Sequence, residues 1–106
     1  MDAALRAIGE PRRREILRLV WDGERSSGEI ASHFDITGPA VSQHLKVLRE
    51  AGLVSERRDG TRHLFSVNHL ALRALRDDLA WMWDDSLADL KRIAESEAKA
   101  VKRRGR

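Results

Sequence analysis

Apolar residues recur every three or four positions through the first third of the chain, and glycines separate the segments. That spacing places the apolar side chains on one face of a helix. Pro11 suits the first turn of the second segment, where a missing N–H group costs nothing. Ser26 and Glu29 have the spacing of a capping box at the start of the third segment. The pattern therefore predicts three helices, over residues 2–8, 11–22 and 26–34.

A fourth helix is predicted from residue 38 to residue 51. Its apolar positions follow at i, i+4 and i+7, which are Val41, Leu45 and Leu48. Thr37 can cap the start of this helix by accepting a hydrogen bond from a free backbone N–H group. Gly52 ends it. Only a short turn separates the third and fourth helices, so residues 26–51 have the layout of a helix-turn-helix.

The hydrophobic period then changes to two, which predicts a β-hairpin over residues 53–67. Asp59 and Gly60 suit a two-residue type I′ turn, in which both central residues have positive φ. Counting back from that turn predicts that Val54 faces Phe65 on the core side. The same count predicts that Arg58 faces Thr61 and that Arg57 faces Arg62. The tip of this hairpin, or wing, carries three cations, Arg57, Arg58 and Arg62.

A long helical segment is predicted over residues 69–101, with Asn68 as its N-cap. Its apolar stripe is wider than contact with one small core requires, which favours a two-fold dimer interface over a helix folded back on its own core. The predicted fold is mostly α with a small β-hairpin. It is a winged helix-turn-helix of five helices in the order α-α-α-α-β-β-α, in a single domain over residues 1–106, with a basic tail at 102–106.

Composition narrows the class of protein. The chain has 106 residues, of which 42% are hydrophobic and 35% are charged, values typical of a globular domain. No apolar run approaches the roughly 18 residues of a membrane-spanning helix. The N-terminus lacks the layout of a signal peptide, so a cytoplasmic location without membrane contact is expected. The absence of cysteine excludes thiolate metal sites and cysteine nucleophiles. The net charge of +3 alone does not indicate a partner.

The outer side of the fourth helix carries polar residues and cations, namely Pro39, Ser42, Gln43, Lys46, Arg49 and Glu50. A helix fits the major groove of DNA, where short polar side chains reach the edges of bases. Gln43 can form a bidentate pair with adenine, Ser42 can bond to either type of base, and Lys46 can reach guanine or phosphate. His44 lies at the flank of the buried side, and both a structural role and a base contact fit that position.

The start of the same helix is built from small residues, Gly38, Pro39 and Ala40. They let the helix N-terminus approach the DNA backbone, where its free N–H groups and partial positive charge suit a phosphate. Thr37 can contact the same phosphate or act only as a cap. The wing cations are expected on phosphates or in the adjacent minor groove; they are Arg57, Arg58 and Arg62.

Simpler interpretations exist for each feature alone. Ser42 and Gln43 also fit an ordinary solvated face, and cations on a hairpin also protect a sheet edge from unwanted pairing. The alternative function is a winged helix that only contacts other proteins, without specific DNA binding. An enzyme is not expected, because the sequence has no glycine-rich phosphate loop and no histidine–carboxylate grouping at a useful spacing. The order of all the features together favours sequence-specific DNA binding.

The run ITGPAVSQHLKVLREAGLV, followed by RRDGTRHLFSV, resembles the ArsR family of bacterial winged-helix repressors. The resemblance covers residues 5–68. It implies a homodimer that binds operator DNA and usually represses transcription, with the recognition helix over 37–51 and the wing over 53–67. A dimer interface is implied on the first and last helices, at Leu5, Ile8, Leu72, Leu75, Leu79, Met82, Trp83, Leu87 and Leu90.

Founding members of that family sense metals, often through a cysteine pair on the third helix, which here reads GEIASHF and has no cysteine. A second metal site in the family uses Asp and His on the last helix. Here that helix has several aspartates, but its one histidine, His69, stands at the very start. Carboxylates alone are weak ligands for soft metals. We therefore predict the non-metal-sensing subgroup, with no metal and no cofactor, and the sequence identifies no inducer.

Overall fold

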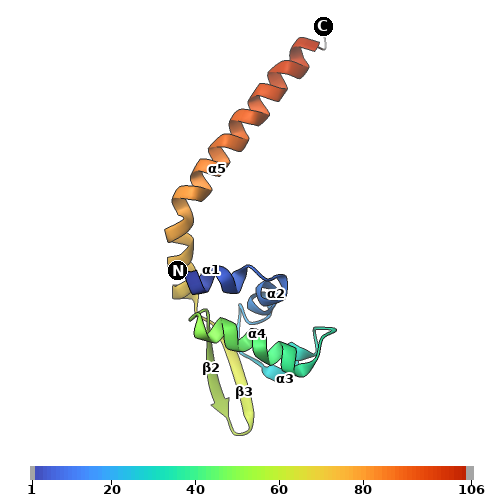
Figure 1. The fold of residues 1–106 in the computed structure, drawn as a ribbon, viewed down its shortest axis with the longest axis vertical. Coiled ribbons are helices and arrows are strands. Elements are labelled where there is room, and N and C mark those ends of the chain that lie inside the picture. Colours follow the sequence, from blue (N-terminus) through green and yellow to red (C-terminus); the bar gives the residue numbers. More distant parts are fainter. Residues whose placement is uncertain (1, 105–106) are drawn as a thin grey trace. The chain divides into compact units, whose positions relative to one another are not determined.

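The computed structural model describes the backbone of residues 2–104 and the side chains of residues 2–81 and 92–98. The described residues form five helices and three strands, in the order α1 (Asp2–Ile8), α2 (Pro11–Leu19), β1 (Arg25–Ser26), α3 (Ser27–Ala31), α4 (Gly38–Glu50), β2 (Val54–Asp59), β3 (Arg62–Val67) and α5 (His69–Arg104) (Figure 1). This order confirms the predicted helices and hairpin and adds one short strand, β1.

Contacts divide the chain into two compact units, Met1–Leu75 and Arg76–Arg106. The first unit holds α1 to α4, the sheet and the start of α5, and the described part of the second unit is the rest of α5. None of the helices within the described part of the chain is long and apolar enough to cross a membrane.

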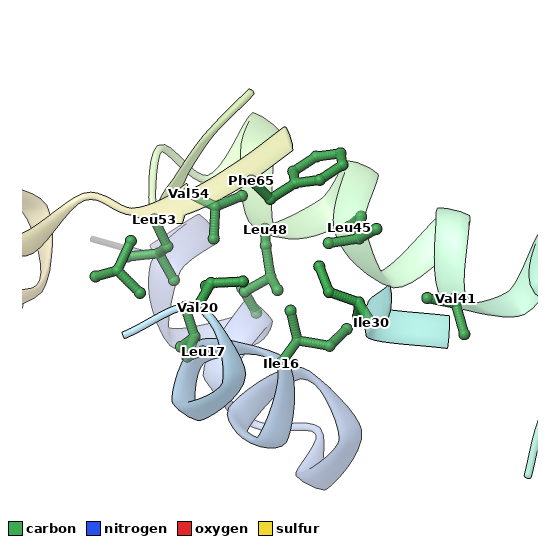
Figure 2. Packing of buried hydrophobic residues seen from close by; sticks show 12 residues of the cluster. Ile16, Leu17, Val20, Ile30, Val41, Leu45, Leu48, Leu53, Val54 and Phe65 are labelled. Atoms are coloured by element: carbon green, nitrogen blue, oxygen red, sulfur yellow. The ribbon is translucent and has the colours of Figure 1, made fainter. Parts of the chain in front are cut away.

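A single apolar core holds the first unit together (Figure 2). It joins Ile16 and Leu17 of α2, Ile30 of α3, the buried side of α4, and residues of the sheet. On α4, Val41, Leu45 and Leu48 are all at most 3% exposed, as their spacing predicted. Leu53, Val54, Phe65 and Val67 cover the core from the sheet side. The core thereby fixes which side of α4 remains outside.

The described ends of α2 and α3 lie earlier than the pattern predicted. α2 ends at Leu19 rather than near residue 22, because the carbonyl of Val20 accepts a hydrogen bond from the N–H of Val67 in β3. α3 ends at Ala31 rather than near Phe34, where tight three-residue hydrogen bonds replace helical ones. The hydrophobic spacing shows neither the sheet pairing that ends α2 nor the tight turn that ends α3.

The turn of the hairpin was predicted wrongly. Asp59 pairs with Arg62, so the two-residue loop is Gly60-Thr61 and not Asp59-Gly60. Gly60 has φ of +63°, and no described residue other than glycine has positive φ. Positive φ at the first central residue only is the pattern of a type II′ turn, in contrast to the predicted type I′.

The strand register is consequently shifted by two residues from the prediction. Val54 pairs with Val67 rather than Phe65, and the other partners are Leu64 for Arg57 and His63 for Arg58. Because side chains alternate between faces with a period of two, a shift of two leaves each residue on its predicted face. Val54 and Phe65 accordingly lie on the core side, at 4% and 6% exposed.

Strand β1 was not predicted, because two residues are too few to show an alternating pattern. It pairs antiparallel with β3 and gives a three-stranded sheet in the order β1-β3-β2. Ser26 ends β1 and caps α3: its hydroxyl accepts from the N–H of Glu29, whose carboxylate accepts from the N–H of Ser26. This confirms the predicted capping box and ties α3 to the edge of the sheet.

Candidate nucleic-acid interface

The side of α4 that faces away from the core is the centre of the candidate site. Ser42, Gln43 and Lys46 are all exposed, while the opposite face of the helix is buried. Arg49 and Glu50 continue the exposed side toward the end of the helix. The structure therefore brings the three predicted base-reading side chains together on one outward face of a helix that the core holds in place.

The start of α4 has the predicted cap. The hydroxyl of Thr37 accepts a hydrogen bond from the N–H of Ala40 at 3.2 Å. Thr37, Gly38 and Pro39 are exposed, Ala40 is half-buried, and open space surrounds the position where Gly38 would carry a Cβ. The early N–H groups of α4 thus lie at an accessible surface, as an approaching phosphate requires.

His44 is placed differently from its neighbours on α4. Its side chain is 17% exposed, and its Nδ1 lies 3.8 Å from a carboxylate oxygen of Glu10. That carboxylate caps α2 by accepting from the N–H groups of Arg12 and Arg13. Nδ1 of His44 is buried without a hydrogen-bond partner among the described residues. These contacts support the structural interpretation of His44, against the N-terminus of α2, and leave only Nε2 as a candidate base contact.

A hollow of about 230 Å³ separates the outer side of α4 from the wing. Glu56 of β2 lies in its wall and joins the two sides. One carboxylate oxygen of Glu56 accepts from Arg49 of α4 at 2.5 Å, and the other lies 2.5 Å from Nδ1 of His63 on β3. The remaining lining comes from residues of α3, α4 and β3, namely Ser27, Ser42, Leu45, Lys46 and Phe65. Glu56 therefore joins the wing to the outer side of α4.

The electrostatics of this bridge favour an ionised carboxylate. The hydrogen bond with His63 and then that with Arg49 hold the pKa of Glu56 below its usual range, against a smaller opposing effect of burial. The side chain of Glu56 is 17% exposed, compared with 46% for Arg49 and 40% for His63. Arg49 and His63 thus keep a side open to solvent while the carboxylate between them is largely covered.

The wing has two faces that carry different cations. Paired residues of an antiparallel ladder share a face, so Arg58 and its partner His63 lie on the face of Glu56, toward α4. Arg57 lies on the opposite face, as does Arg62. The three cations predicted at the wing tip therefore divide between two faces, and only Arg58 lies on the side of α4.

Arg57 and Arg62 lie on the face of the wing that is turned away from α4, called the far face below, and both are paired with carboxylates. Arg57 donates two hydrogen bonds to the carboxylate of Glu24, each at 3.0 Å, in a bidentate arrangement. Arg62 donates to Glu29 at 3.2 Å. Arg58 forms no ion pair or hydrogen bond with the part of the chain that the structure describes. It is therefore the wing cation that is available to an anionic partner.

Sequence reasoning missed the roles of Glu56 and His63, and it did not commit to Arg49. Arg49 is exposed three residues after Lys46, a position that the helical period already indicated. Glu56 and His63 lie on neighbouring strands, and the predicted register already puts both on the core side, because a shift of two keeps each residue on its face. Their contacts with each other and with Arg49 depend on how the hairpin packs against α4, which the hydrophobic pattern does not show.

Of the proposed dimer residues, Leu5, Ile8 and Leu72 are half-buried within the first unit, and Leu75 is buried. Leu79 is half-buried in the second unit. Four of them lie outside the described side chains, namely Met82, Trp83, Leu87 and Leu90. Exposed apolar residues on the described part of α5 include Leu70, Trp81 and Ile93, at 74%, 66% and 57%. α5 therefore shows apolar surface in both units.

The described residues contain no group of three or more His, Cys, Asp or Glu side chains that could hold a metal ion. His69 at the start of α5 contacts Trp21 instead: Nε2 lies 3.0 Å from the carbonyl oxygen of Trp21, and the two rings meet edge to face at 4.9 Å. One ring nitrogen of His69 is thus engaged within the chain.

Comparison with known protein families and structures identifies close relatives of this architecture. The model of a family described as "Bacterial regulatory protein, arsR family" matches residues 10–56, which contain α2, α3, α4 and the start of β2. The homodimeric winged helix-turn-helix DNA-binding domain of Mb0332 from Mycobacterium bovis has a TM-score of 0.64 at 32% identity, over 74% of this chain and 76% of that chain. This likeness confirms the winged helix-turn-helix fold.

Three relatives illustrate the range of sequences. The HTH-type transcriptional regulator Rv2034 of Mycobacterium tuberculosis is 38% identical over 96 residues, covering 91% of this chain and 90% of that protein. The transcriptional repressor SdpR of Bacillus subtilis is 38% identical over 82 residues, covering 77% and 88%. The arsenical resistance operon repressor of Staphylococcus xylosus is 32% identical over 79 residues, covering 74% and 76%. Because this last relative is named for arsenical resistance, the non-metal-sensing subgroup stays a prediction.

Proposed function

Because the chain belongs to the arsR family of bacterial regulatory proteins, we propose that it represses transcription as a homodimer bound to an inverted-repeat DNA operator. Members of this family are DNA-binding regulators, and we propose no catalytic role. The site of action is the DNA of a bacterial cytoplasm. We propose no effector for the chain.

The observation that carries the proposal is the division of α4 into two faces. Val41, Leu45 and Leu48 are buried and fix the helix, so its orientation does not depend on the exposed side. Ser42, Gln43 and Lys46 stand together on the exposed side with donors and acceptors that suit base edges. A rigid helix with readers on its outer face is the element that enters a major groove.

Backbone contacts are proposed on both sides of these readers. The accessible N–H groups at the start of α4 suit one phosphate, next to Thr37 and Gly38. Across the hollow, Arg58 is the available cation of the wing, and Lys46 and Arg49 line the near side. Such contacts position a protein on the duplex, and the exposed face of α4 then supplies the specificity.

We propose that residues of α5 and α1 form the dimer interface. Trp81 and Ile93 of the second unit are more than half exposed in the single chain. In proteins most of the stability of a helix comes from packing of its apolar side rather than from intrinsic helix propensity. A second copy provides that burial, and a two-fold axis then places the two copies of α4 about one turn of DNA apart. Light scattering should give twice the 12.1 kDa mass of one chain.

Binding of duplex DNA at several salt concentrations tests the proposal, with Arg58→Ala as the variant and Arg18→Ala as the control. Arg18 lies on α2, paired with Glu15, and is 75% exposed. Arg58→Ala should weaken binding to all sequences and reduce the salt slope by about one per copy, and Arg18→Ala should change neither. A winged helix used only for protein contacts predicts no salt-dependent DNA binding by any of the three proteins.

A further inference from the structure

We propose that Glu24 is a specificity-determining residue, which holds Arg57 on the far face of the wing and thereby weakens binding to DNA of unrelated sequence. The inference rests on the proposed DNA-binding function. Neither residue belongs to the recognition side of α4: Arg57 lies on the sheet face opposite Glu56, and Glu24 lies just before β1.

The geometry of the pair is specific rather than incidental. Nε and Nη2 of Arg57 each donate to a different oxygen of Glu24 at 3.0 Å, so the guanidinium and the carboxylate meet as two parallel forks. The two residues are 33 positions apart in the chain, and the pairing of β1 with β3 brings their segments together. The hydrogen bond to Arg57 holds the pKa of the Glu24 carboxyl below its usual range, so the carboxylate is ionised at neutral pH.

A second arginine on the same face of the wing, Arg62, is also paired with a glutamate. Arg62 donates to Glu29 at 3.2 Å, and Arg25 lies 3.8 Å from the other oxygen of that carboxylate. Glu29 also forms the capping box of α3, so its replacement would disturb the fold. Glu24 forms only the pair with Arg57 among the described contacts, which makes it the residue through which the far face can be tested.

The pair affects DNA binding because the Glu24 carboxylate and a DNA phosphate compete for the same N–H groups of Arg57. A phosphate that approaches Arg57 must displace Glu24 and meets its negative charge. In the operator complex the register is fixed by α4, and the near face of the wing, with Arg58, is the one turned toward the recognition side. In complexes with unrelated DNA no register is fixed, and cations on either face of the wing can contribute. A free Arg57 would therefore strengthen unrelated binding more than operator binding.

The test measures binding to two duplexes, one recovered by selection from random DNA and one of scrambled sequence, at several salt concentrations. Glu24→Gln should raise affinity for the scrambled duplex about two- to fivefold, the range of one exposed ion pair. It should also steepen the salt slope by up to about one per copy and change affinity for the selected duplex less. Arg57→Ala added to Glu24→Gln should abolish the gain.

Glu15→Gln is the matched control, because Glu15 is also an exposed acid paired with an arginine, here Arg18 on α2. It makes the same change in net charge away from the wing. The inference is overturned if Glu24→Gln and Glu15→Gln have equal effects, or if the gain persists without Arg57. If the unmodified chain binds neither duplex, the proposed function fails and the inference fails with it; specific binding with no effect of Glu24→Gln overturns the inference alone.

Discussion

Replacement of Glu56 by glutamine removes the charge that joins α4 to the wing while keeping the shape of the side chain. Glu56 accepts from Arg49 and contacts His63, and both partners are cations or can become so. Glutamine keeps one acceptor oxygen, so one of the two hydrogen bonds can persist without its charge assistance. The variant therefore tests the electrostatic bridge rather than the packing around it.

The expected loss follows from the two hydrogen bonds and their exposure. A hydrogen bond to a charged group contributes about 1.5–3 kcal/mol when it is well buried. Arg49 and His63 are 46% and 40% exposed, so solvent screening reduces that value. With one bond partly retained, we expect Glu56→Gln to lower the free energy of unfolding by about 1–2 kcal/mol at pH 7.

The effect of pH has a definite sign. Because the pKa of Glu56 is lower in the folded chain than its usual value, the ionised carboxylate contributes stability above about pH 4.3. That contribution is lost as the pH falls through the folded-state pKa, where the carboxylate becomes neutral like the glutamine. The difference between the two proteins should therefore be full at pH 7 and should shrink steadily as the solution is made more acidic than the usual pKa.

Urea unfolding followed by circular dichroism measures this difference, at one fixed protein concentration because a dimer is stabilised by mass action. Glu50→Gln is the control: Glu50 is exposed at the end of α4, and the same change in charge there should alter stability by less than about 0.5 kcal/mol. Equal stability of the unmodified chain and Glu56→Gln at pH 7, or a difference that grows as the pH falls below the usual pKa of a glutamate carboxyl, would contradict this electrostatic role of Glu56.

Two further substitutions test how α4 is held. Leu48 is fully buried in the core, so Leu48→Ala should lower the free energy of unfolding by about 2–5 kcal/mol in the same urea experiment, and a loss below 1 kcal/mol would contradict its central place. Thr37→Ala removes the N-cap of α4 and should cost about 1 kcal/mol, whereas Thr37→Ser, which keeps the hydroxyl, should stay close to the unmodified chain. Equal losses for both Thr37 variants would show that the hydroxyl does not act as a cap.

The helices and the division of α4 into a buried and an exposed side could be predicted because each depends on local information. Val41, Leu45 and Leu48 define the buried side of α4 by spacing alone, and Thr37 and Ser26 mark helix starts by chemistry that acts within three residues. The structure confirmed all of these. It also confirmed that Val54 and Phe65 cover the core, since that depends only on the period of two.

Features that depend on pairing between distant segments were not predictable in the same way. β1 exists because residues 25–26 find the edge of β3, and α2 ends early because Val20 bonds to Val67. The hairpin turn lies one residue later than predicted. The register, which places His63 opposite Arg58, was therefore also predicted wrongly. The pairing of Arg57 with Glu24 spans 33 residues and leaves no local signal.

Selection of bound sites from random duplex DNA, carried out in parallel with the unmodified chain and with Gln43→Ala, tests whether the exposed face of α4 reads base sequence. The unmodified chain should enrich an inverted repeat whose half-sites are about 10–10.5 base pairs apart, centre to centre. Gln43→Ala should enrich the same repeat but lose about 1–3 kcal/mol of discrimination at one base pair in each half-site. No enrichment by the unmodified chain, or identical base preferences for the two proteins, would contradict the claim that the exposed face of α4 reads DNA.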